Sequence, residues 1–94
     1  MSKLNELKKY SNPEVVMMKA RDMGLNTIQV STRKDKKYMV YDSNKKLVHF
    51  GQMGYEDYTK HKDKKRRDSF RKRNIKWGYA PKYTPAWLSF WLLW

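Results

Sequence analysis

The residue types that most often carry chemistry gather in one stretch of the chain, between positions 48 and 63. It holds both histidines, His49 and His61, together with the carboxylates of Asp57 and Asp63. Imidazole and carboxylate groups suit divalent metals, and the same groups could serve a nuclease. However, His61 and Asp63 are only two positions apart, and no HxxxH or CxxC spacing accompanies them. We therefore expect no metal site: the histidines should fix a turn by hydrogen bonding, and the aspartates should cap local backbone.

Two further features contain residue types that are used in catalysis or phosphate binding, but the sequence around them does not match a known motif. Ser69 lies in a basic run without the glycine elbow that presents a nucleophilic serine. The segment Gly51-Gln52-Met53-Gly54 lacks the GxxxxGK[ST] or GxGxxG spacing of phosphate loops, and a turn with glycines at positive φ is the favoured interpretation. These patterns predict a protein that is not an enzyme, with no cofactor and no small-molecule substrate.

The net charge predicts a polyanionic partner. The 94 residues include 22 Lys and Arg against 9 Asp and Glu, which gives a formal charge of +13. Residues 60–94 hold 11 of these bases and only 2 acids, whereas residues 1–59 hold 11 bases and 7 acids. A field of this size implies nucleic acid, an anionic membrane face or an acidic protein surface. The charge alone does not choose among the three.

Most of the excess charge lies in a predicted helix. Asp63 should cap this helix, which runs through Asn74 and is ended by Gly78. Only Phe70 is apolar within it, and Trp77 follows at a spacing that places it on the same helix face as Phe70. The helix therefore needs support from the region of Trp77 or from a partner. It lacks a clear set of base-reading side chains, which favours contact with phosphate backbone over sequence-specific reading. The predicted polyanion-binding residues are Lys60, Lys62, Lys64, Lys65, Arg66, Arg67, Arg71, Lys72, Arg73 and Lys76.

The aromatic end of the chain is a second candidate surface. Thr84 and Pro85 predict a capped helix start, and the following segment, Ala86–Trp94, is apolar on nearly every side. It is much shorter than the roughly 20 residues that cross a bilayer. Burial in the core or in a protein interface is the favoured interpretation, and insertion at a membrane interface is the alternative. The predicted partner-docking residues are Trp87, Leu88, Trp91 and Trp94.

The elements that position these groups predict a single α+β domain over residues 1–94. An N-terminal helical segment, 1–25, contains a helix that Ser11 or Asn12 would cap and Gly24 would stop. Runs at 27–32, 38–41 and 46–50 predict a three-stranded antiparallel β-meander over 26–50, with a charged turn at 33–37. Such a sheet needs one covered face, which the first helix or the C-terminal aromatic helix would supply.

The rest of the domain follows from these elements. Residues 51–62 form a junction in which the glycines turn the chain off the last strand, and residues 63–94 hold the basic helix and a short C-terminal aromatic helix. The chain has no cysteine, which excludes disulfides and fits a reducing compartment, and its first residues lack the apolar core of a signal peptide.

Four motifs appear in order in the second half of the chain. They are V-H-F-G at 48–51, G-Y-x-D-Y-T-x-H-K-D at 54–63, R-R-x-x-F-x-x-R-N at 66–74 and T-P-A-W-L-S-x-x-L-L-W at 84–94. In this order the motifs resemble a family of short basic proteins encoded by nucleocytoplasmic large DNA viruses, the giant viruses of algae, amoebae and animals. That family has no assigned activity, so the resemblance implies a viral setting and lends no catalytic residues.

Two functions remain open. In the favoured one, the protein is a structural component of a virus particle, a minor capsid or internal virion protein. Its aromatic end would dock on another capsid protein, while its basic helix would lie against acidic protein, an anionic membrane face or the genome. In the alternative, it is a viral protein that binds DNA or RNA through the phosphate backbone in the host cytoplasm or virus factory.

Overall fold

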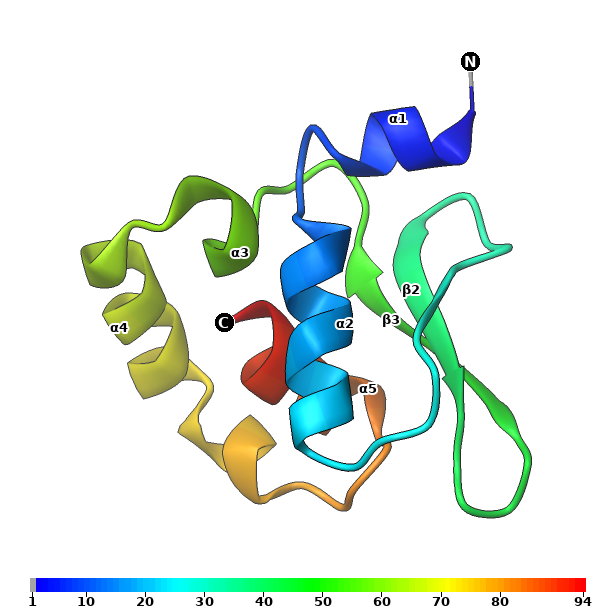
Figure 1. Cartoon of the computed structure of the whole chain (residues 1–94). Helices are drawn as coiled ribbons and strands as arrows, with labels where there is room; N and C mark the ends of the chain where they lie inside the picture. Colours follow the sequence, from blue (N-terminus) through cyan, green and yellow to red (C-terminus); the bar gives the residue numbers. More distant parts are fainter. Residues whose placement is uncertain (1) are drawn as a thin grey trace.

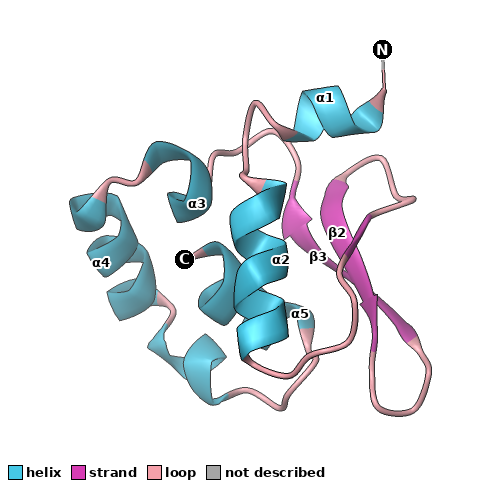
Figure 2. Ribbon diagram, in the orientation of Figure 1, coloured by secondary structure: helices cyan, strands magenta, loops and turns pink. Residues whose placement is uncertain are grey.

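The computed structural model describes residues 2–94 as an α+β fold, with a small antiparallel sheet on one side and helices on the other (Figures 1 and 2). The strands β1 (Gln29–Val30), β2 (Lys36–Tyr41) and β3 (Leu47–Gln52) lie in the order β1-β2-β3. The register places Tyr38 opposite Phe50, and their rings stack at 5.6 Å between centroids. The predicted three-stranded meander is therefore confirmed.

The first strand is shorter than the predicted run 27–32. The chain turns away after Val30 because the hydroxyl of Ser31 accepts a hydrogen bond from Arg33 N at 3.0 Å. A serine hydroxyl that bonds backbone two residues ahead offers an alternative to the strand ladder. Ile28 still points into the core, where its side chain is 3% exposed.

The N-terminal segment forms α1 (Lys3–Leu7) and α2 (Pro13–Asp22). Asn12 Oδ1 caps α2 by accepting from Val15 N at 3.4 Å, and proline occupies the first turn, where its missing N–H leaves no bond unmade. Gly24 has φ +72°, and Leu25 N donates to Ala20 O at 2.9 Å, which closes the helix in a Schellman motif. Both predicted ends of this helix are confirmed.

The aromatic end forms α5 (Pro85–Leu88), which continues as a π-helical turn, η2 (Ser89–Leu93). Thr84 Oγ1 caps it by accepting from Trp87 N at 3.3 Å, as predicted. This C-terminal segment, drawn in orange to red in Figure 1, packs against β3 and α2 and supplies much of the core. The core is formed by Leu7, Val16, Ala20, Ile28, Tyr38, Val40, Phe50, Met53, Tyr83, Leu88, Leu92 and Leu93.

Between the sheet and this segment the chain forms α3 (Tyr58–His61), α4 (Lys64–Arg73) and the 3₁₀ turn η1 (Ile75–Tyr79), drawn in green to orange in Figure 1. The prediction that Gly78 ends the basic helix was wrong, because α4 ends at Arg73 and Gly78 lies inside η1. Gly78 instead permits close packing, since a Cβ there would lie 2.9 Å from Phe90 Cε1.

Two further predictions about the sheet need correction. Lys36 and Lys37 were assigned to a charged turn, yet both belong to β2. Gly51 was expected to end the sheet, but it lies within β3 with φ +81°. A Cβ at Gly51 would meet Leu93 Cδ1 at 2.9 Å and Lys37 Cβ at 3.1 Å, so the missing side chain lets the C-terminal segment seat against the sheet.

Candidate functional site

The junction after β3 is fixed to the sheet by a buried ion pair. Lys37 Nζ lies 3.0 Å from Asp57 Oδ2, and the two side chains are 3% and 1% exposed. Lys37 also donates to Tyr55 O at 2.6 Å, and Thr59 Oγ1 donates to Asp57 Oδ1. Burial lowers the pKa of Lys37, and the neighbouring Asp57 carboxylate opposes that shift. The pair therefore holds the junction and the start of β2 together.

This arrangement corrects the expected role of Asp57. It stands before α3, but its side chain makes no capping hydrogen bond. Its carboxylate faces the sheet instead, and its backbone N–H donates to Tyr10 O at 3.0 Å. Thr59 Oγ1 also accepts from Asn12 N at 2.9 Å, so the junction joins the α1–α2 loop to β2. The central part of the stretch 48–63 therefore has a structural role, because it connects the α1–α2 loop to β2.

The two histidines lie apart, since His61 ends α3 and His49 lies within β3. His61 Nδ1 accepts a hydrogen bond from Asp63 N at 2.9 Å, which confirms that it fixes the turn between α3 and α4. His49 Nδ1 lies 2.7 Å from Ser31 Oγ in the turn after β1. Burial, followed by nearby Arg66, lowers the pKa of His61, and burial also lowers the pKa of His49. Among residues 2–94, no three His, Asp or Glu side chains are grouped to hold a metal ion.

The basic helix α4 starts and is supported as the sequence indicates. Asp63 Oδ1 accepts from Lys65 N at 3.0 Å and from Arg66 N at 3.3 Å, which confirms the predicted cap. Phe70 lies in edge contact with Trp77 at 5.6 Å between centroids, and it stacks on Trp94 at 4.2 Å with an interplanar angle of 7°. One apolar side chain thus anchors the helix between two tryptophans.

The ten predicted cations divide into two groups. Arg67 and Arg71 turn inward and are half-buried. The Arg67 guanidinium lies 4.7 Å from the centre of the Tyr58 ring, and Arg71 Nη2 donates to Trp94 O at 2.9 Å. These two arginines hold α4 against the domain. The exposed group is Lys60, Lys62, Lys64, Lys65, Arg66, Lys72, Arg73 and Lys76, which we call the outer cations.

The predicted docking residues also divide. Leu88 is 0% exposed and belongs to the core, so it cannot contact a partner in the folded state. Trp87 and Trp94 are half-buried against the core, and Trp91 is 41% exposed, with its Nε1 donating to Gly78 O at 3.2 Å. Among the predicted docking residues, Trp91 is therefore the most accessible.

Sequence reasoning missed the exposed apolar residues of η1. Ile75, Trp77 and Tyr79 are 50%, 38% and 85% exposed. They lie directly after α4, so they extend the basic helix with an apolar surface. The available signal was three large apolar residues within five positions, immediately after a run that holds almost none.

None of the helices formed by residues 2–94 is long and apolar enough to cross a membrane. Comparison with known proteins finds no curated protein and no solved structure that matches the chain. A family of unknown function, DUF5754, matches residues 26–74, a span that contains the sheet, the junction and the basic helix. Because this match covers more than half of the 94 residues, the chain belongs to that family of unknown function.

Proposed function

We propose that this protein is a non-enzymatic structural component of a large DNA virus particle that docks on an acidic neighbouring surface. The observation that carries the proposal is the set of eight outer cations, six of which lie on the capped and anchored helix α4 or directly after it. The viral setting comes from the ordered motifs of the second half of the chain. In this proposal the protein acts through the surface formed by the outer cations and not through an enclosed catalytic group.

The anchoring of α4 supports a role in docking. An isolated surface ion pair contributes only about 0.2–1 kcal/mol, because ordering two long side chains offsets much of the attraction. A helix that is already held reduces that ordering term, since its backbone does not have to be fixed on binding. The Phe70–Trp94 stack and the bond from Arg71 to Trp94 hold this helix before any partner arrives. The outer cations can therefore act as a set.

The viral proposal is tested with purified particles of the virus that encodes the chain. Quantitative mass spectrometry should find the protein at a fixed ratio to the capsid proteins after density-gradient purification. Its cross-links to neighbours should involve the outer lysines, such as Lys64 and Lys72, more often than exposed lysines elsewhere, such as Lys8 and Lys46. Absence from the particles would refute the structural role.

Binding of a polyanion through the same surface is tested with two charge-matched triple variants. The first combines Lys64→Gln, Lys65→Gln and Lys72→Gln. The control combines Lys8→Gln, Lys9→Gln and Lys46→Gln, which removes three charges from exposed positions outside the helix. Only the first variant should lose most of its retention on a heparin column. Equal losses would show that net charge alone drives binding.

A second function, binding of nucleic acid, is favoured by the exposed rings of Trp77 and Tyr79 next to the outer cations. Aromatic side chains beside a basic surface can stack on unpaired bases at about 1–3 kcal/mol per base. If about six phosphates are contacted, affinity for a labelled oligonucleotide should fall about 10³-fold between roughly 50 and 200 mM salt. Trp77→Ala should weaken binding to single strands more than to duplex. No measurable binding at physiological salt would exclude this function.

A further inference from the structure

We infer that a cavity between β3 and the C-terminal segment is a pocket for one apolar side chain of an acidic peptide segment on a partner protein. The inference rests on the proposed docking function, because it specifies the chemistry of the neighbour. The pocket lies beside α4 but is lined by none of the outer cations, and Arg66 only approaches Glu56, one of the lining residues. The two proposals can therefore fail separately.

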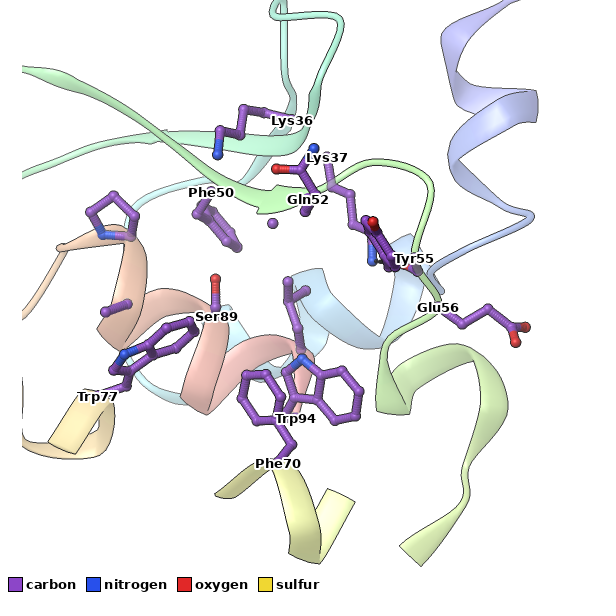
Figure 3. Close-up of a pocket in the computed structure, with 14 residues that line it drawn as sticks. Lys36, Lys37, Phe50, Gln52, Tyr55, Glu56, Phe70, Trp77, Ser89 and Trp94 are labelled. Atoms are coloured by element: carbon purple, nitrogen blue, oxygen red, sulfur yellow. Dashed lines mark hydrogen bonds between the residues drawn. The ribbon is translucent and has the colours of Figure 1, made fainter. Parts of the chain in front are cut away.

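The cavity has a volume of about 560 Å³ and is drawn in Figure 3. This volume lies within the range of about 300–1,000 Å³ that is usual for ligand pockets. Its apolar wall includes side chains from β3, α4, η1 and the C-terminal segment, namely Phe50, Phe70, Trp77, Leu93 and Trp94. Figure 3 shows the ring of Phe50 above the cavity and the Phe70–Trp94 stack below it. The site is thus an aromatic-lined slot beside a strand.

The lining favours an apolar side chain over a nucleobase. Ser89 is the one hydroxyl-bearing residue on the C-terminal side of the cavity, and its oxygen points toward Phe50 in Figure 3. A base placed against these rings would leave most of its polar edge without partners, which is unfavourable in a buried site. A leucine, methionine or phenylalanine side chain has no such polar edge. Anchors of this kind supply most of the affinity in many protein interfaces.

The rim favours acidic residues around the anchor. Lys36 and Gln52 face each other across β2 and β3 at the mouth, and neither side chain makes a hydrogen bond to another part of residues 2–94. Glu56 also lines the cavity, but Arg66 Nη1 lies 3.9 Å from its carboxylate and offsets that charge. An acidic flank would gain a partner in Lys36 and would enter the positive field of the outer cations.

The neighbouring strand offers a way to hold an extended peptide. β3 stands at the edge of the sheet, and its outer side has no strand partner among residues 2–94. Three consecutive residues at the end of this strand, Phe50, Gly51 and Gln52, line the cavity. A peptide that adds to a strand edge uses its backbone for affinity and inserts alternate side chains into adjacent pockets. The edge and the cavity together therefore fit an extended acidic segment with one apolar anchor.

The test uses a labelled acidic hexapeptide with one central phenylalanine and a matched peptide with alanine at that position. The phenylalanine peptide should bind at least about 30-fold more tightly, the ratio that loss of a buried anchor produces. Ser89→Phe should fill the cavity and remove this ratio, whereas Ser43→Phe, in the exposed β2–β3 turn, should leave it unchanged. In the unmodified protein, only the phenylalanine peptide should shift the indole N–H signals of Trp77 and Trp94 by NMR, which tests the pocket even if Ser89→Phe does not fold.

The outcomes separate the pocket from the docking surface. The triple variant of Lys64, Lys65 and Lys72 described above removes three outer cations. If the two peptides bind the unmodified protein equally and both bind this variant more weakly, the pocket is overturned and the docking surface stands. If that variant weakens both peptides but keeps their ratio, the pocket is supported. A short duplex or a phosphatidylserine vesicle that displaces the phenylalanine peptide and shifts the same indole signals would overturn the assignment to a peptide. Failure of both peptides and of heparin to bind would overturn both proposals.

Discussion

The buried pair of Lys37 and Asp57 should dominate the response of this domain to single substitutions. Asp57→Asn keeps the size of the side chain but removes its charge, leaving the Lys37 ammonium in a site where it is 3% exposed. Loss of one partner from a buried ion pair costs about 3–5 kcal/mol, because the remaining charge has neither water nor a counterion. Small domains have a free energy of unfolding of only about 5–15 kcal/mol, so the variant should be close to unfolding.

Urea denaturation followed by tryptophan fluorescence measures this loss. Lys37→Met should cost a similar amount, since it leaves the Asp57 carboxylate buried without its ammonium partner. The double variant should lose clearly less than the sum of the two single variants, because it contains neither charge. If Asp57→Asn stays within about 1 kcal/mol of the unmodified protein, or if the losses add, the pair is not the joint that the geometry indicates.

The pH dependence gives an independent check of the same reasoning. Burial lowers the pKa of Lys37 from its ordinary 10.5, and Asp57→Asn removes the charge that opposes this shift. Between the lowered pKa and 10.5 the unfolded chain binds more protons, so the free energy of unfolding rises with pH. The variant should therefore regain more stability than the unmodified protein between about pH 7 and 9.5. Higher pH is unsuitable, because burial raises the pKa of Tyr38 and ionisation of unfolded tyrosine then favours unfolding.

Two other predictions concern backbone fit and acid stability. Gly51→Ala should destabilise the fold by about 1–3 kcal/mol more than Gly54→Ala. Both glycines have positive φ, but only a Cβ at Gly51 collides with Leu93. The midpoints of urea denaturation of the two variants measure the difference. The lowered pKa of His61 means that the unfolded chain binds more protons below about pH 6.5, so stability falls from pH 7 to 5. His61→Asn should reduce the difference in melting temperature between those two pH values, and an unchanged difference would exclude His61 as its source.

The capped helix starts and the end of α2 could be predicted because capping is local chemistry. Asn12, Asp63 and Thr84 each accept a hydrogen bond from a backbone N–H three residues ahead or nearer, so a few neighbouring residues determine the outcome. The stop at Gly24 is local for the same reason. The meander followed from alternation and turn residues, which also act over short distances. These features needed no knowledge of the rest of the chain.

The burial of some basic side chains could not be predicted, because it depends on distant contacts. Lys37 follows four other charged residues in the sequence, and the partners that permit its burial, Tyr55 O and Asp57, lie 18 and 20 positions later. Arg71 is one of many bases in its run, and it turns inward because Trp94, 23 positions later, presents a carbonyl oxygen. Periodicity placed Phe70 and Trp77 on one face but gave no sign of the Phe70–Trp94 stack. From the sequence alone, a basic residue is expected at the surface, and for Lys37 and Arg71 tertiary contacts make this expectation wrong.

Phe70 and Trp94 take part in both proposed surfaces. Their stack forms one side of the cavity, and together with the bond from Arg71 to Trp94 it fixes α4, which carries most of the outer cations. An anchor that fills the cavity would pack against this stack without moving α4, which the stack already holds. A partner that contacts both surfaces makes its second contact within the same complex, where the effective concentration is high. A partner with an apolar anchor and an acidic surface would therefore bind more tightly than the two separate affinities imply.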